Sequence, residues 1–186
     1  MTMKPTPGKT ARSVARLARL IGEKMTLGQE QLQDLAIAAL LHDVGKIAIS
    51  DAVLTKRTPL TLEEREVINQ HPVMGSNIIR PVTASIDIVR SVLHHHEHFD
   101  GTGYPDGLSG REIPLGARII AVADAYHAMI SNRPYRPALP SGQALAALRA
   151  NMEGQFDPEV VDVFARVVES GEIRDLEDLA PGSLTG

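Results

Sequence analysis

Six residues have side chains that commonly bind divalent metal ions. Each stands where a buried polar group would need a partner: five at the ends of expected helices and one inside an apolar helix. They are His42, Asp43, His71, His95, His96 and Asp124. Histidine and carboxylate ligands together favour iron, manganese or zinc over calcium or magnesium. Since the chain has no cysteine, no thiolate competes for such a metal.

Each of these residues also has an ordinary structural explanation. A single histidine at a helix end is more often a hydrogen-bonded core or surface residue than a ligand. Asp124, within ARIIAVADAYHAMI, could instead be paired with a buried arginine. The six residues together are better evidence for a metal centre than any one of them alone, because their side-chain types and expected positions would suit a single centre.

Phosphoester hydrolysis is the chemistry that this set suits best. Asp43 has two carboxylate oxygens and could bridge a pair of metals. Two metals about 3.5–4 Å apart generate a hydroxide and stabilise developing charge. The adjacent His95 and His96 could serve one metal or two neighbouring ones. Lys46 would face the same side as Asp43 if the helix continued, where its ammonium suits a phosphate oxygen, although a solvated lysine is as good an explanation.

The elements that must position these residues are helices. Apolar periodicity predicts helices over residues 10–24, 29–41, 61–71, 73–79, 86–95, 117–130, 141–152 and 158–170, with a short helical turn at Asp51–Leu54. Thr61 and Glu64 form a capping-box pattern, and Pro72 should end or kink the helix before it. Residues 97–116 form a glycine-rich loop of a length that is usually functional. With no credible strand series, the fold class is all-α.

Composition sets the remaining limits. The 186 residues suffice for one sizeable domain, which we place at residues 10–170, between a tail or linker stub at 1–9 and a C-terminal helix or tail at 171–186. A net charge of −4 gives no general basic surface for duplex DNA. There is no apolar run of membrane-spanning length and no signal-peptide core. The absence of cysteine suits a cytoplasmic protein.

Several motifs in order resemble the HD-GYP domain, a branch of the HD phosphohydrolase superfamily that cleaves cyclic di-GMP. They begin with His42-Asp43 followed by Gly45-Lys46, and continue with HHE at residues 95–97 and DGTGYP at 100–105. The segments IPLGARIIAVADAYHAM, NRPYR and QFDPEVVDVF extend the resemblance to residue 164. The resemblance implies a helical bundle with a long GYP loop.

Roles for individual residues follow from this resemblance. The six candidate ligands fall on family metal positions, with Asp43 as the bridge and a catalytic residue. Lys46 matches the family lysine near the scissile phosphate, so it is both a catalytic and a substrate-binding candidate. Further substrate-binding candidates are Gly103, Tyr104, Arg133 and Arg136. The expected cofactors are two divalent ions, iron or manganese, with zinc as an alternative.

One departure from the family pattern separates the functional hypotheses. The family usually places a metal-binding histidine on the first helix, where this chain has Thr10, and trinuclear members add a glutamate where it has Thr6. The leading hypothesis is a phosphodiesterase that cleaves cyclic di-GMP to linear pGpG through a two-metal bridging hydroxide, with further cleavage to GMP left open. One alternative is a degenerate domain that binds cyclic di-GMP or a protein without turnover. The other is hydrolysis of another cyclic nucleotide or dinucleotide. The family also makes diguanylate cyclase (GGDEF) domains candidate partners through the GYP loop.

Overall fold

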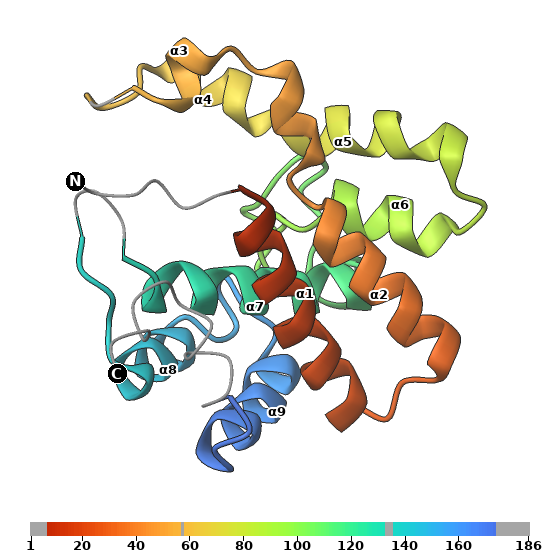
Figure 1. Ribbon diagram of the computed structural model, residues 1–186, viewed down its shortest axis with the longest axis vertical. Helices are drawn as coiled ribbons and strands as arrows, with labels where there is room; N and C mark the ends of the chain where they lie inside the picture. The colour runs from red at the N-terminus through yellow and green to blue at the C-terminus, as the bar shows by residue number, and fades with distance from the viewer. Residues whose placement is uncertain (1–6, 57, 133–135, 174–186) are drawn as a thin grey trace, which may run out of the picture.

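The computed structural model describes residues 7–56, 58–132 and 136–173, and these form helices, turns and loops, with one isolated bridge between Met152 and Phe156. The all-α prediction is confirmed (Figure 1). The α-helices are α1 (Pro7–Lys24), α2 (Gln29–Leu41), α3 (Asp51–Leu54), α4 (Leu62–Asn69), α5 (His71–Ile79), α6 (Ile86–Leu93), α7 (Leu115–Ile130), α8 (Ser141–Ala150) and α9 (Pro158–Glu169). Short 3-10 turns are η1 (Val44–Ala48), η2 (Arg80–Val82) and η3 (Gly110–Glu112).

Local caps explain why several helices begin where they do. At α4 the Thr61 hydroxyl accepts the Glu64 N–H at 3.2 Å, and the Glu64 carboxylate accepts the Thr61 N–H at 2.8 Å. This reciprocal pair is the expected capping box, and it satisfies two N–H groups that the helix leaves free. At α9 Asp157 accepts the Glu159 N–H at 2.8 Å. The residues that form both caps can be recognised in the sequence, so both helix starts could be predicted from it.

Helix α7 is the centre of the bundle. It packs against α1, α6, α8 and α9, and its residues Ile119, Ile120 and Val122 are fully buried. In Figure 1 α1 and α2 cross in front of α7, while α5 and α6 lie to one side of it. The short α3 and α4 project away from this core, and no residue of either is buried. The apolar faces of α1, α2, α6 and α9 therefore converge on α7 and fix the ends of the helices that carry polar residues.

The sequence-based boundaries differ from the structure at two places that affect the site. Helix α2 ends at Leu41, and the chain turns through η1 instead of continuing as a helix. The helix before Pro72 does end, at Asn69, but Pro72 itself lies in the first turn of the next helix, α5, which begins at His71. Proline is favoured there because its missing N–H has no helical partner to lose. His71 is thus fixed by the start of a helix and not by the end of one.

Helix α1 begins at Pro7, so it includes residues that the sequence assigned to a tail. No helix in the described ranges has both the length and the apolar character that a membrane crossing requires. Residues 1–6, 57, 133–135 and 174–186 lie outside the description, and with them Thr6, Arg133 and most of the expected C-terminal segment.

Candidate metal centre

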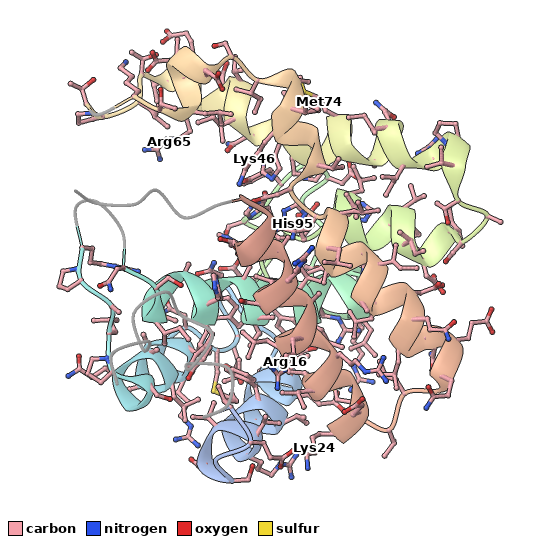
Figure 2. All side chains as sticks on the ribbon, in the orientation of Figure 1. Arg16, Lys24, Lys46, Arg65, Met74 and His95 are labelled. Carbon is pink, nitrogen blue, oxygen red and sulfur yellow. The ribbon has the colours of Figure 1, made fainter. Side chains whose placement is uncertain are left out.

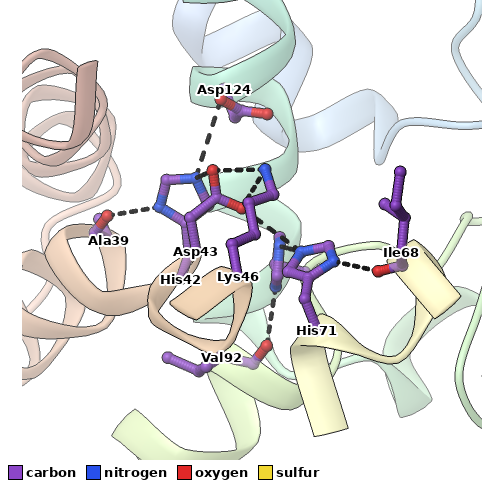
Figure 3. A network of polar contacts seen from close by, with 9 residues as sticks. Ala39, His42, Asp43, Lys46, Ile68, His71, Val92 and Asp124 are labelled. Atoms are coloured by element: carbon purple, nitrogen blue, oxygen red, sulfur yellow. Dashed lines mark hydrogen bonds and ion pairs between the residues drawn. The ribbon is translucent and has the colours of Figure 1, made fainter. Parts of the chain in front are cut away.

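The six predicted ligands come from four helices and the turns that follow them. His42 caps the C-terminal end of α2, with Asp43 next in the chain, and His71 begins α5. His95 and His96 follow the end of α6, and Asp124 lies in α7. Figure 3 shows Asp43 and Lys46 between His42 and Asp124 on one side and His71 on the other. Figure 2 labels Lys46 and His95 near each other, in the central part of the molecule.

Three of the histidine rings are oriented by backbone carbonyl groups. In each, Nδ1 lies 2.7 Å from a carbonyl oxygen three residues earlier in the chain (Figure 3): His42 with Ala39, His71 with Ile68 and His95 with Val92. A carbonyl only accepts, so Nδ1 carries a hydrogen and Nε2 is turned inward, where a neutral ring presents its lone pair. This orientation is typical of histidines that bind metals through Nε2.

The inward nitrogens of His71 and His95 lie 3.3 Å apart. Since both carry lone pairs, a direct hydrogen bond between the two neutral rings has no proton to use. His71, His95 and His96 each offer one ligand atom, and all three atoms lie within 4.8 Å of one another. A cation between these nitrogens would satisfy them together. The structure thus brings both adjacent histidines next to His71, at one point.

Asp43 connects the two sides of the centre. Its Oδ1 lies 3.3 Å from His71 Nε2, and its Oδ2 lies 3.5 Å from His42 Nε2. Lys46 Nζ is 2.6 Å from each of these oxygens, although η1 and not a continued helix brings it there. A carboxylate with its two oxygens toward different histidines suits the bridging role expected of Asp43. Lys46 places a positive charge against the same group.

The side that contains His42 and Asp124 has fewer ligands. His42 Nε2 lies 3.9 Å from Asp124 Oδ1 and is buried without a hydrogen-bond partner among the described residues. A buried ring nitrogen without a partner carries a desolvation cost that a bound cation would offset. The residues therefore fit a metal ion here too, but with one histidine where the other side has three.

Burial sets the charge of these groups in the metal-free chain. Burial lowers the pKa of His96 to about 3, with the neighbouring His71 adding to the shift. The pKa of His95 also falls well below its ordinary value, mainly through burial. For Asp43, burial raises the pKa, but the neighbouring His71, His42 and Lys46 outweigh it, so its pKa falls well below the usual range. At neutral pH His95 and His96 therefore offer neutral imidazoles and Asp43 an ionised carboxylate, the states that bind metals.

Two glycines let backbone segments approach more closely than other residues would. A Cβ on Gly45 would lie 2.0 Å from the His71 carbonyl oxygen and 2.6 Å from the Gly75 nitrogen. A Cβ on Gly103 would lie 2.2 Å from the His98 nitrogen. The first contact holds η1, with Lys46, against the start of α5. The second folds the GYP loop back on the segment that carries His95 and His96.

The predicted substrate-binding residues differ in how closely the structure places them to the metal ligands. The Tyr104 ring stacks on His96, with centroids 5.0 Å apart and planes at 22°. Burial, followed by the charge of Asp43, raises the pKa of Tyr104 to about 12. Arg136 is exposed, and its Nη2 donates to the Ala128 carbonyl oxygen at 2.8 Å, one turn beyond Asp124 on α7. Arg133 lies outside the described residues.

Comparison with known proteins agrees with the motifs. The HD domain family model matches residues 2–160. The chain belongs to the HD domain family. The family recognised from the motifs is thereby confirmed. Among solved structures, an HDG"Y"P protein from Bdellovibrio bacteriovorus shares the fold, with a TM-score of 0.72 at 20% identity over 88% of this chain and 53% of that chain.

Two curated relatives are similar in sequence as well. The cyclic di-GMP phosphodiesterase response regulator RpfG of Xanthomonas campestris pv. campestris is 43% identical over 155 residues, 82% of this chain and 41% of the relative. The 3'3'-cGAMP-specific phosphodiesterase 3 of Vibrio cholerae serotype O1 is 38% identical over 154 residues, 83% of this chain and 33% of the relative. The chain therefore spans less than half the length of either protein.

Proposed function

We propose that the chain is a metal-dependent phosphodiesterase domain that cleaves cyclic di-GMP to linear pGpG. The observation that carries this proposal is the position of Asp43. One of its oxygens faces His71, the other faces His42, and Lys46 contacts both oxygens. Carboxylate-bridged metal pairs are a recurring device for phosphoester hydrolysis. The relative from Xanthomonas campestris, which is named a cyclic di-GMP phosphodiesterase, supports the choice of substrate.

Two metal ions would be held unequally. His71, His95 and His96 would hold the first, His42 and Asp124 the second, and Asp43 would be shared. The ligand types favour iron or manganese, with zinc as an alternative. When bound, such ions lower the pKa of water and offset negative charge on a phosphate. Because the second position has one histidine, we expect it to bind metal more weakly than the first.

The side chains around the centre supply what a cyclic dinucleotide needs. The Lys46 ammonium, about a third exposed and close to Asp43, can move to a phosphate oxygen and stabilise the charge that develops there. The half-buried Tyr104 keeps its proton at neutral pH, because its pKa is about 12, and it holds the His96 ring in place by stacking. Arg136 and Arg133 are proposed phosphate contacts, since guanidinium groups bind phosphates in pairs of hydrogen bonds.

The direct test is product analysis. The protein is incubated with cyclic di-GMP and Mn²⁺ or Fe²⁺, and the nucleotides are separated by chromatography. We expect linear pGpG from the wild type and from Asp162→Asn, which changes an exposed aspartate on α9, but at least 10²-fold less from Asp43→Asn. Absence of linear product from the wild type with either metal, while both metals bind, would refute the proposal.

A second substrate class is supported by the relative from Vibrio cholerae, which is named a 3'3'-cGAMP-specific phosphodiesterase. Both dinucleotides present the same phosphodiester ring, which the metal centre and Lys46 would treat alike. A panel of cyclic di-GMP, 3'3'-cGAMP and cyclic di-AMP at equal concentrations would rank them by kcat/KM. A preference for cyclic di-GMP is expected.

A nucleotide-binding or protein-binding module without turnover is the alternative from another class. The observation that favours it is the sparse side of the centre, where Thr10 stands at the register of the missing histidine and His42 Nε2 has no partner among described residues. Calorimetry separates the two functions: tight binding of cyclic di-GMP without product in any metal would support the module. GGDEF domains remain proposed partners of the GYP loop, and a pull-down with a purified GGDEF domain tests this.

A further inference from the structure

A second group of ligand-type side chains lies beside the metal centre and shares no residue with it. His94 follows the last residue of α6. Glu97 lies shortly before the DGTGYP segment of the GYP loop, and Asp106 comes directly after that segment. Each offers one ligand atom, and the three atoms lie within 4.8 Å of one another. None of the functions assigned above uses these three residues.

His94 has the same ring orientation as the ligands of the main centre. It is buried, and its Nδ1 lies 2.9 Å from the Arg90 carbonyl oxygen, which can only accept. Its Nε2 faces Asp106 Oδ2 at 2.9 Å. A protonated ring would donate to Asp106 here and form an ion pair with it. In a neutral ring with the hydrogen on Nδ1, two acceptors face each other, and a bound cation would take the place of the proton between them.

Glu97 gives an independent indication of a missing partner. The residue is only 3% exposed, which is rare for a glutamate without a compensating charge. Its Oε1 accepts the Asp106 N–H at 2.7 Å, but its Oε2 is buried with no hydrogen-bond partner in the described part of the chain. A buried carboxylate oxygen without a donor or a cation is costly. The same carboxylate belongs to the cluster with His94 and Asp106.

We propose that His94, Glu97 and Asp106 bind a second-site divalent cation, separate from the metal centre of the proposed phosphodiesterase. One imidazole nitrogen and two carboxylates suit Zn²⁺ or Mn²⁺. Half of the Asp106 side chain is exposed, so water has access to complete the coordination. The ion would join the end of α6 to the GYP loop, across the contact in which Gly103 packs on Glu97.

The local structure prepares this site before any ion binds. The bond from the Asp106 N–H to Glu97 holds the two carboxylate residues together, and the carbonyl of Arg90 holds the His94 ring. Little rearrangement is therefore needed, which favours binding. Because Asp106 is the exposed ligand, its side chain can be removed without leaving a cavity in the core.

The test counts metal ions bound by the full chain. Metal-free wild type, Asp106→Ala and the control Asp162→Ala are titrated with Zn²⁺ and with Mn²⁺ by calorimetry, and bound metal is measured after dialysis. We expect Asp106→Ala to bind one equivalent fewer than the other two, or to bind that equivalent at least tenfold more weakly. Equal numbers and affinities in all three proteins would overturn the proposal and leave these residues as a hydrogen-bonded anchor of the loop.

Two further variants test whether the metal ion lost in Asp106→Ala was bound at this site. In Asp43→Asn the main centre loses its bridging carboxylate, and the second-site equivalent should persist. In Asp43→Asn combined with Asp106→Ala it should disappear, and with it the visible absorption of the corresponding Co²⁺ ion. Loss of the equivalent in Asp43→Asn alone, with no further change in the double variant, would contradict a separate site. Neither result depends on phosphodiesterase activity.

Discussion

Replacing Gly45 by alanine should separate η1 from the start of α5. The new Cβ would meet the His71 carbonyl oxygen at 2.0 Å and the Gly75 nitrogen at 2.6 Å, and both of these are backbone atoms that cannot rotate away. Ordinary nonbonded separations are about 3.5 Å, so the segments must move apart by more than ~1 Å. Overpacking costs about 1–3 kcal/mol, and the rigidity of this contact places Gly45→Ala near ~3 kcal/mol.

Gly142→Ala is the matched control for this substitution. Gly142 lies in the first turn of α8, and a Cβ there would meet nothing within 4 Å. Its replacement should leave stability unchanged or raise it by about 0.4–1 kcal/mol through the unfolded chain. Urea unfolding of the two metal-free variants and the wild type measures both effects. For a chain of this size, a loss of about 3 kcal/mol would lower Tm by roughly 6–12 °C.

The same movement should weaken metal binding. Asp43 precedes η1 and His71 begins α5, so their 3.3 Å approach would lengthen. Displacing a ligand's support commonly costs about 10–100-fold in metal affinity, which a metal titration of folded Gly45→Ala would measure. If the free energy of unfolding of Gly45→Ala lies within about 0.5 kcal/mol of the wild-type value and its metal affinity is unchanged, the argument from close approach is refuted.

Three other changes test separate parts of the site. The pKa values of His95 and His96 are depressed in the folded state, so the free energy of unfolding of the metal-free protein should be highest above pH ~6.5 and fall as the pH falls toward 3. Urea unfolding from pH 7.5 to 4 measures this, and the free energy of unfolding of His96→Gln should depend less on pH. Gly103→Ala should displace the loop and Tyr104, and lower kcat/KM by up to roughly 10²-fold. Thr10→His should supply the ligand that the family places on the first helix, raising the affinity for the weaker metal and the rate of product formation.

Each of these predictions can fail in a definite way. Acid stability that does not change between wild type and His96→Gln would show that the buried ring is not held neutral. Wild-type kinetics in Gly103→Ala would show that the loop tolerates the added carbon. Unchanged metal binding in folded Thr10→His would show that α1, which packs against α2 and α7, does not bring this position to the centre.

The helices could be predicted because their signals are local. Residues 29–41 and Asp51–Leu54 were expected with the bounds that α2 and α3 have, and the Thr61–Glu64 pair fixed the start of α4. Pro72 follows the end of α4, as expected, but its place in the first turn of α5 was not predicted, because a proline that ends one helix and a proline that begins the next look alike in sequence. Only the packing of α5 against η1 distinguishes them.

The site was partly predictable for a related reason. Ligand types and motif order singled out six residues, and the structure brings them together, but their roles remain proposals. The close approach at Gly45 was not predicted, because it depends on backbone atoms from a distant segment. The burial of Glu97 and the pairing of His94 with Asp106 were missed because they depend on how the GYP loop folds back. Lys46 reaches Asp43 through η1, a turn that periodicity does not reveal.

The ligands of the candidate centre are spread from the end of α2 to the middle of α7, and this has a thermodynamic consequence. A metal ion held by them would bind the folded chain far better than the unfolded one, so the free metal concentration would enter the folding equilibrium directly. At a free metal concentration of 100 times Kd, one such ion adds about 2.7 kcal/mol to stability. A melting temperature measured for this chain would therefore be a property of the chain and its metal supply together, and a chelator would act as a mild denaturant.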